Sequence, residues 1–517
     1  MDRSLVDKSY TLDKLAVNSI ALNVESSKLD VVYNVFIKII WASFFLFLPV
    51  TNFPIFPSSF GGAALVRPLS LYPLILLFIL YTLPRLSSRP FPKTFLSLAP
   101  FLLVAVVSSL VSFFRGIEPV LGIPVYERVL RTLLTLGIGA AIYFTVSLLP
   151  RSKKDLDFSL RWMYAGLAAA LLWGSLQALY IIKFNQSWFN LMEHYQQFIS
   201  TRHLFDNRIS GLTYEPNWFA EQLSFLYLPW LLASVFNGKS VFPWRRRWLT
   251  VELLLLTWTI CLLPFTYSRA GVLNLVMVTV FGWFLYLIQP RKNKAAGGLI
   301  VNKSRLKRLR SLIHSFIQTT IIISIIVVPI YLVGTKNPFF ARLWGYWESS
   351  NPSISGYLSY LGFDARLAFS EAAYNTFDAY PITGVGLGNY VYYFEDMLPY
   401  RPLADSPELM NVLTPEAGRV RLITAKNFYL RLLAETGAVG LAAFIAFLVA
   451  VFGCALYLFL SPKKGERFWG KAGLCAFFTF LITAFSYDSF AIPNMWVVFG
   501  LITSAAWVTN QARNLEH

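Results

Sequence analysis

The sequence predicts an all-α, polytopic membrane protein with about twelve membrane-spanning helices and one large helical loop outside the membrane. Three observations lead to this fold class. Of 517 residues, 56% are hydrophobic and only 14% are charged, whereas soluble domains carry roughly 25% charged residues. Apolar runs close to the length of about 20 residues that a spanning helix needs recur along the chain. Basic residues gather in alternate connections between these runs, which is typical of cytoplasmic loops.

The apolar runs define the predicted spans. These are 33–52, 66–84, 95–114, 126–148, 160–182, 216–236, 248–266, 270–289, 312–333, 430–460, 472–487 and 494–510. The run 430–460 is too long for one straight span, so we expect its first turns to project beyond the bilayer.

The basic residues predict the orientation of the spans. They concentrate at the N-terminus and in the connections near 85–93, 151–154, 239–247 and 463–471, while segment 291–310 holds eight basic residues and no acidic one. If the spans alternate, all these segments lie on one side, which the positive-inside trend identifies as the cytoplasm. Both termini are then cytoplasmic. The net charge of +18 is explained by topology and by contact with anionic membrane lipids, so no nucleic-acid partner is expected.

The same pattern divides the chain into predicted regions. They are a cytoplasmic segment 1–32, a first membrane part 33–333, a large external loop 334–429, a last membrane part 430–510 and a cytoplasmic tail 511–517. The loop is far longer than the 12–15 residues of a plain connection, which indicates a function. Segment 364–379 within it reads as an amphipathic helix, and the glycine-rich stretch 381–390 reads as a tight turn. We expect a small helical cap.

Three arginines on the external side oppose the charge trend. Arg208 lies in RISGLTYEPNWFAEQ, Arg269 lies in TYSRAG between two spans, and Arg366 opens the loop helix. Charges at a membrane edge usually face a cavity or a partner, and the planar guanidinium fork matches phosphate oxygens. Together the three would suit a diphosphate on a lipid carrier. The alternative is that each reaches lipid headgroups or pairs with a nearby acid such as Glu215 or Glu221.

Glycines accompany two of these arginines. Gly211 and Gly271 follow Arg208 and Arg269 closely, and we expect them to let the backbone approach a ligand. Neither a zinc motif nor a G-x-S-x-G elbow is present, so we predict no metal site and no cofactor. The run GVGLGNY at 384–390 lacks the preceding strand of a nucleotide-binding loop, and we interpret it as a loop-to-helix turn.

The motifs, in their order and spacing, resemble those of the O-antigen ligase and O-antigen polymerase superfamily of membrane enzymes. The matching pieces are RISGLTYEPNWFAEQ at 208–222, TYSRAG at 266–271, ARLAF at 365–369, PITGVGLGNY at 381–390 and AKNFYLRLLAETGAVG at 425–440. The last resembles the family's His-Asn, nine-residue, Gly-x-x-Gly signature, with Asn427, Gly437 and Gly440 in register. The resemblance covers roughly residues 33–510.

The resemblance implies a GT-C-like fold in a bacterial inner membrane, with its active face in the periplasm. It also implies a metal-independent, inverting transfer or polymerisation of glycan from an undecaprenyl-diphosphate donor to a glycan or lipid acceptor. Arg208, Arg269 and Arg366 would then bind the diphosphate, while Lys426 and Asn427 would orient donor or acceptor. Other polysaccharide assembly proteins are further candidate partners.

One position departs from the family pattern. Lys426 stands where ligases carry the catalytic histidine, and a lysine with its ordinary pKa of about 10.4 is charged at neutral pH. It therefore suits diphosphate binding better than proton abstraction, which favours a polymerase over a ligase. Glu215 is the leading candidate for the base, followed by Glu371 and Glu435. The alternative for Glu215 is that it caps a helix or pairs with Arg208.

Several alternatives remain open from the sequence. The chain could be an O-antigen ligase, an anion or solute transporter of the same architecture, or a noncatalytic partner in polysaccharide export. The loop also contains many aromatic residues that would stack on sugars, pack the cap or lie at the membrane interface. They are Trp344, Tyr346, Trp347, Tyr357, Tyr360, Tyr390, Tyr392 and Tyr393.

Overall fold

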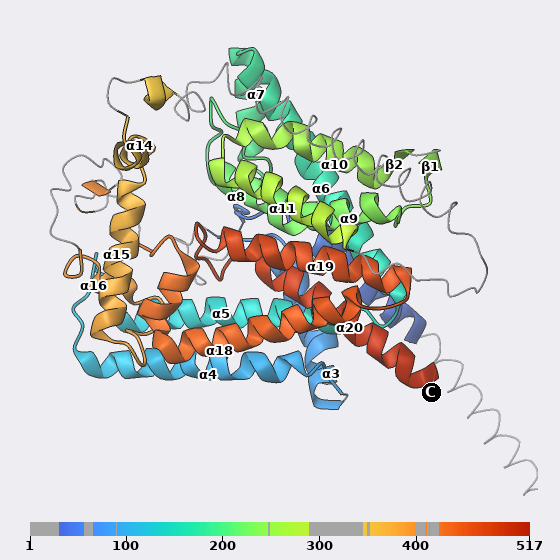
Figure 1. Cartoon of the computed structure of the whole chain (residues 1–517), viewed down its shortest axis with the longest axis horizontal. Coiled ribbons are helices and arrows are strands. Elements are labelled where there is room, and N and C mark those ends of the chain that lie inside the picture. The colour runs from blue at the N-terminus through green and yellow to red at the C-terminus, as the bar shows by residue number, and fades with distance from the viewer. Residues whose placement is uncertain are drawn as a thin grey trace, which may run out of the picture.

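The computed structural model describes most of the chain and shows a helical protein (Figure 1). The described residues are 30–55, 66–88, 90–246, 249–288, 345–348, 352–398, 409–410, 413 and 423–516. The predicted span 312–333, the basic segment 291–310 and most of the predicted segment 1–32 lie outside these ranges. Strand structure in the described part is confined to a small antiparallel pair, β1 (Arg245–Arg246) and β2 (Leu249–Thr250).

The first half of the chain forms helices at the predicted spans. After a helix over residues 30–46, these are α2 (Leu71–Leu77), the π-helical turn η2 (Phe78–Thr82), α3 (Leu83–Ser88), α4 (Thr94–Ser112), η3 (Phe113–Arg115), α5 (Val125–Leu148), α6 (Lys153–Ile182) and α7 (Gln186–Gln196). Next come α8 (Pro216–Glu221), the π-helical turn η4 (Gln222–Tyr227), α9 (Leu228–Asn237), α10 (Val251–Leu262), η5 (Leu263–Thr266) and α11 (Arg269–Leu287).

The second half contains the loop elements and the last membrane helices. The loop elements are the 3₁₀ turn η6 (Tyr346–Glu348), α14 (Ile354–Tyr360), α15 (Asp364–Ala379) and α16 (Tyr390–Tyr393). The last helices are α18 (Phe428–Phe459), α19 (Lys464–Thr483) and α20 (Asn494–Glu516). The predicted amphipathic helix at 364–379 is therefore confirmed as α15.

Six helices in the described part are long and apolar enough to cross a membrane. They are Thr94–Arg115, Val125–Leu148, Lys153–Ile182, Pro216–Asn237, Arg269–Leu287 and Phe428–Phe459. This agrees with a multi-pass membrane protein. The count of about twelve spans stays a prediction, although five further predicted spans coincide with helices: 30–46, α2 to α3, α10, α19 and α20.

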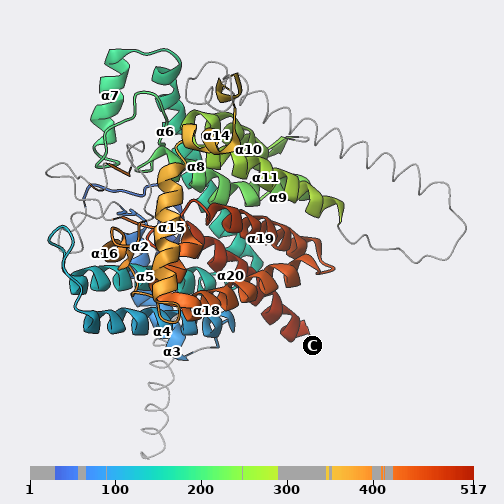
Figure 2. The same ribbon diagram turned by 60° about the vertical axis from the view of Figure 1, so that its left-hand side comes forward.

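The helices α4, α5 and α18 run side by side, and α15 crosses one end of this group at a steep angle (Figures 1 and 2). Helix α18 also packs against α19, and α20 packs against α5. We call the end of the bundle at which α15 lies the capped end. It holds the first turns of α5 and α18 and the last turn of α4, because the loop after α15 bonds to each of them.

The cap is fixed to the bundle by small side chains. One face of α15 presents Ala365, Ala368, Ala372 and Ala373, all of them buried, toward a core that includes Tyr390, Phe394 and Ala434. Alanines keep the two backbones close, and they are also strong helix formers. The cap helix thus packs directly on the first turns of α18.

Helix α18 is interrupted at Gly437, whose backbone has a φ of 67° and a ψ of −172°. The break frees backbone groups, and the glycine-rich stretch bonds to them. Val385 N–H donates to Ala434 O at 2.9 Å, Gly386 N–H donates to Glu435 O at 2.9 Å, and Ala438 N–H donates to Pro381 O at 2.8 Å. We call this set of bonds the clasp. It satisfies groups that would otherwise be buried without partners.

Glycine is required on both sides of the clasp. A Cβ added to Gly437 would lie 2.1 Å from Ile382 O, and one added to Gly384 would lie 2.4 Å from the Glu435 carbonyl carbon. The interpretation of 384–390 as a structural turn is thereby confirmed: the turn docks on a membrane helix. The long predicted run 430–460 is likewise divided into two helical parts.

A buried acid holds the opposite end of the bundle together. Glu466 of α19 pairs with Lys153 of α6 at 3.1 Å and with Arg513 of α20 at 2.8 Å, and it accepts a hydrogen bond from Ser461. The turn between α18 and α19 is therefore tied to two other helices at this end.

Candidate functional site

Three arginines from separate segments gather at the capped end, beside the starts of α8 and α11. We call Arg202, Arg208 and Arg269 the arginine cluster. Arg208 donates from Nε to Thr266 O at 2.8 Å and from Nη2 to Asn217 Oδ1 at 2.9 Å. The loop that carries Arg208 is anchored on α6, because Gln177 Oε1 accepts hydrogen bonds from Ser210 and Gly211 N–H. The guanidinium therefore has a fixed position.

Arg202 and Glu215 form the ion pair of this cluster. Arg202 Nη1 lies 2.7 Å from Glu215 Oε1, and both side chains are partly buried. Glu215 is also the N-cap residue of α8, but its side chain does not cap the helix. Arg202 is thus the hydrogen-bonded partner of Glu215, while Arg208 donates to Asn217 and Thr266 and is also influenced by the charge of Glu215.

The charges of the cluster influence one another. Burial lowers the pKa of Arg208 below its ordinary value; the Glu215 carboxylate raises this pKa, and the cations Arg202 and Arg269 lower it again. An arginine remains charged under such a shift. Among the described residues, Arg208 thus lies beside two further cations and one carboxylate, and such a concentration of positive charge suits an anionic ligand.

Arg269 links the cluster to the cap. It is the first residue of α11, where the N-cap Ser268 accepts a hydrogen bond from Gly271 N–H. Its Nη1 donates to Leu361 O at 2.9 Å, in the short connection between α14 and α15. The start of α11 thus holds the beginning of the cap helix, and its N-terminal dipole adds to the positive potential there.

The glycines beside Arg208 and Arg269 have a different role from the one expected. A Cβ on Gly211 would lie 2.6 Å from the Phe219 ring, and one on Gly271 would lie 2.6 Å from Ala220 Cβ. The space beside both glycines is filled by α8 rather than left open toward a ligand. These positions are glycine because α8 packs tightly between the two arginine-bearing segments.

A second group of polar residues surrounds the start of α18. Lys426 has a left-handed backbone with a φ of 55°, and its N–H donates to Asp488 Oδ2 at 2.8 Å. Its side chain is exposed. Asn427 is the N-cap, and its Oδ1 accepts hydrogen bonds from Tyr429 and Leu430 N–H. Asn427 therefore has a defined structural role in addition to any role in chemistry.

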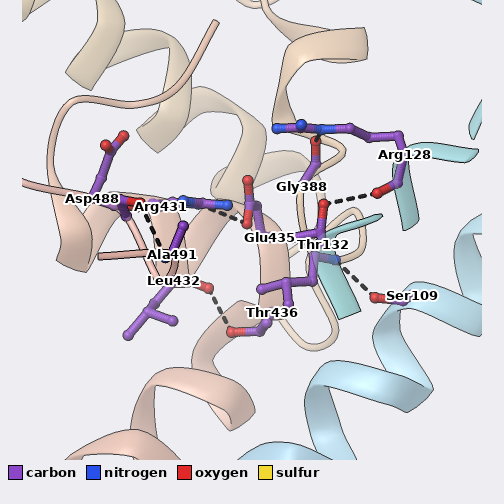
Figure 3. A network of polar contacts seen from close by, with 12 residues as sticks. Ser109, Arg128, Thr132, Gly388, Arg431, Leu432, Glu435, Thr436, Asp488 and Ala491 are labelled. Carbon is purple, nitrogen blue, oxygen red and sulfur yellow. Dashed lines mark hydrogen bonds and ion pairs between the residues drawn. The ribbon is translucent and has the colours of Figure 1, made fainter. Parts of the chain in front are cut away.

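Arg431 and Glu435 form a buried ion pair within α18 (Figure 3). Arg431 Nε lies 3.0 Å from Glu435 Oε2, and the Arg431 guanidinium also donates to Asp488 O. Arg128 of α5 lies nearby, where its Nε donates to Gly388 O at 2.9 Å. The network therefore joins α18, the glycine-rich turn, α5 and the connection between α19 and α20.

Helix α8 joins the two groups. Asn217 and Glu221 lie one turn apart on it; Asn217 holds Arg208, and Glu221 Oε1 accepts a hydrogen bond of 3.2 Å from Asn494 Nδ2 at the start of α20. The connection before α20 carries Asp488, which holds both Lys426 and Arg431. The π-helical turn η4 begins directly after Glu221, and such turns are frequent at functional sites.

The structure brings together some predicted site residues and leaves others apart. Arg208, Arg269 and Glu215 share one cluster, and Lys426 and Asn427 are adjacent at the start of α18. Arg366 is exposed on α15, and its side chain forms no hydrogen bond or ion pair with a described residue. Of the alternative bases, Glu435 is occupied by Arg431, and Glu371 is half-buried on α15.

Sequence reasoning missed Arg202, Arg431 and Asp488. For Arg431 and Glu435 a signal existed, since an opposite-charge pair four residues apart within an apolar helix indicates a buried ion pair. Arg202 and Asp488 lie in connecting loops without a motif. Within the described ranges, no three His, Cys, Asp or Glu side chains are grouped as a metal ion would require.

The helical bundle, its cap and the arginine cluster define a multi-pass membrane protein with a cationic site at one end of the bundle. Residues 253–445 match the model of a protein family described as O-antigen ligase. Over these residues the match confirms the resemblance to the O-antigen ligase and polymerase superfamily, and it supports glycan handling of that type. It includes Arg269, Arg366, Lys426 and Asn427, whereas Arg208 and Glu215 precede it. No curated protein matches the chain.

Proposed function

We propose that the chain polymerises, or transfers to an acceptor, a glycan carried on undecaprenyl diphosphate at the periplasmic face of the bacterial inner membrane. The observation that carries this proposal is the arginine cluster. Its cations lie beside the starts of α8 and α11 and are each held by a defined partner. Such an array is preorganised for the charge of a diphosphate, so little reorganisation is needed when the ligand binds.

The reaction would proceed by displacement at the anomeric carbon. An acceptor hydroxyl oxygen forms the new bond to this carbon, and the bond from the carbon to the diphosphate oxygen breaks with inversion. The electron pair leaves with the diphosphate, and the hydroxyl proton passes to a base. In this proposal Arg208, Arg269 and Arg366 bind the diphosphate and stabilise its growing charge without a metal ion.

Glu215 is the proposed base, and Lys426 and Asn427 are proposed to orient donor or acceptor. Support for Glu215 comes from its partly buried carboxylate at the start of α8; inversion requires this base to take the proton from a hydroxyl that approaches the sugar face opposite the diphosphate. The exposed ammonium of Lys426 supports a role in binding diphosphate or a glycan phosphate. Because this lysine replaces the histidine of the family signature, we propose polymerisation first and ligation as the alternative.

The test is turnover by the purified full chain in vesicles, with undecaprenyl-diphosphate oligosaccharide as donor and EDTA present. We expect a ladder of products from the wild type and a loss of about 100-fold or more in rate for Arg269→Ala. Arg131→Ala is the matched control, since Arg131 is an exposed arginine paired with Glu127 on α5. It should retain the wild-type rate.

Each other outcome has a defined meaning. A single transfer onto an added lipid acceptor would identify a ligase. Equal rates for Arg269→Ala and the wild type would remove Arg269 from the diphosphate site. No turnover, together with solute flux in the same vesicles, would overturn the enzyme and support a transporter.

A further inference from the structure

Four aromatic side chains form a cluster in the cap that the diphosphate site does not use. We call Tyr346, Trp347, Tyr357 and Tyr360 the aromatic cluster. The ring centroids are 5.1 Å apart for Trp347 and Tyr357, 5.5 Å for Tyr346 and Tyr360, and 5.7 Å for Tyr346 and Tyr357. These are ordinary distances for packed aromatic pairs. The rings therefore support each other as one surface.

The aromatic cluster is held by defined contacts, although it is not buried. Tyr346 Oη accepts a hydrogen bond from Ser353 N–H, and a Cβ on Gly356 would lie 2.0 Å from this same oxygen. Only glycine lets Tyr346 lie against α14. Yet 48% of Trp347 and 46% of Tyr360 remain exposed. These exposed rings present flat faces on which a ligand can stack.

The backbone connects the aromatic cluster directly to the arginine cluster. Leu361 follows Tyr360; its N–H donates to Tyr357 O at 3.0 Å, and its carbonyl accepts the hydrogen bond from Arg269 at 2.9 Å. A ligand with its diphosphate at Arg269 would therefore have its next chemical group near the rings. In a polyprenyl-diphosphate glycan, the diphosphate joins a polyprenyl chain to a sugar; because the polyprenyl chain belongs in the bilayer, the group beside the cap would be the sugar.

We infer that the aromatic cluster binds the glycan of the lipid-linked donor, with Trp347 and Tyr360 stacked against sugar faces. This inference rests on the proposed function, since it takes the diphosphate to lie at Arg269. Aromatic faces carry negative potential, and they attract the weakly positive C–H groups of a pyranose face. Tyr hydroxyls and the indole N–H supply hydrogen bonds at the ring edges.

The test measures binding rather than turnover. The purified full chain is titrated with two probes, undecaprenyl diphosphate without sugar and undecaprenyl-diphosphate oligosaccharide. We expect Trp347→Ala to weaken binding of the oligosaccharide probe by about 3- to 10-fold and to leave the sugar-free probe unaffected. Trp347→Phe should retain most of the affinity. Arg269→Ala should weaken both probes, and Tyr195→Ala, which removes an exposed tyrosine on α7, should change neither.

Four results would overturn the inference. Equal weakening of both probes by Trp347→Ala would mean that the cluster only supports Arg269. An unchanged affinity for both probes, with Trp347 fluorescence quenched by brominated lipids, would assign the cluster to the membrane interface. If the wild type binds neither probe, the proposed function fails and the inference fails with it. Binding of both probes with no preference for the sugar overturns the inference alone.

Discussion

At the scale of single residues, the candidate site contains side chains whose polar atoms hold the structure and side chains that are exposed. Asn427 and Arg431 have their polar atoms engaged by α18 and Asp488. Lys426 differs, since its backbone is held while its side chain is exposed. The left-handed conformation of a lysine is unfavourable by about 1–2 kcal/mol, and residues kept in such conformations often mark functional sites.

Substitutions of Lys426 can separate its backbone from its side chain. Lys426→Gly and Lys426→Ala both remove the ammonium, but only glycine adopts a φ of 55° without steric cost. We expect Lys426→Gly to be more stable than Lys426→Ala by about 1 kcal/mol, measured by thermal unfolding in detergent. Both should lose glycan transfer to the same extent if the ammonium binds the donor. Full activity in either variant would exclude Lys426 from the site.

The buried pair Arg431–Glu435 has an exposed counterpart in Glu127–Arg131, and both are spaced four residues apart in a helix. We expect Arg431→Met to lower the free energy of unfolding by about 3–5 kcal/mol, because Glu435 is left buried without its partner. Arg131→Met should cost about 0.5 kcal/mol or less. The double change Arg431→Met with Glu435→Leu should recover most of the loss. Unfolding midpoints of the three variants and wild type give the comparison, and equal effects of the two single changes would contradict it.

At the scale of elements, the break in α18 and the glycine-rich turn form one unit. Neither can be understood alone, since the turn supplies hydrogen bonds that the break leaves open. From the sequence, the glycines of 381–390 indicated a tight turn, and the length of the run 430–460 indicated that its first turns project beyond the bilayer. That the two segments bond to each other was not predictable, because nothing in either motif encodes the contact between them.

Gly437 and Gly453 offer a matched test within α18. A methyl group at Gly437 would collide with the Ile382 carbonyl, and the φ of 67° is strained for any other residue, whereas the space beside Gly453 is open. We expect Gly437→Ala to destabilise the protein by several kcal/mol and to release the clasp. Gly453→Ala should stabilise it by about 0.5–1 kcal/mol. Proteolysis of the 381–390 stretch in the two variants would measure the release. Similar protection in both would refute the clasp.

At the scale of the whole molecule, the multi-pass helical fold could be predicted from composition and apolar length, because the bilayer leaves few alternatives. The grouping of Arg208 with Arg269 could be predicted as well, because each arginine lies just before the external end of a predicted span, 216–236 or 270–289. Arg202 could not, because its position depends on how a loop without motifs folds onto α6. The expectation that Gly211 and Gly271 face a ligand was wrong, because spacing alone does not show that α8 fills the space.

The predicted orientation can be tested with single cysteines in a background where Cys261, Cys454 and Cys475 are replaced by serine. Asp378→Cys on the exposed face of α15 should react with a membrane-impermeant thiol reagent in intact spheroplasts. Lys464→Cys, at the exposed start of α19 beyond the opposite end of the bundle, should react only after permeabilisation. The reverse pattern would place the arginine cluster on the cytoplasmic side and overturn the proposed periplasmic active face.

The clasp also limits how this loop can be exchanged between related proteins. Under the proposed function, swapping the external region to change which glycan is accepted would have to cut within the described residues 352–363 before α15, where Leu361 O is bonded to Arg269. A junction placed between residue 390 and the start of α18 would combine a foreign 381–390 turn with a native α18. The carbonyls and amides of the turn would then face backbone groups of α18 with which they did not evolve to bond. Stretch 381–390 and residues 427–440 would therefore have to be exchanged together. Under the proposed function, changes in sugar preference are expected around α14 instead.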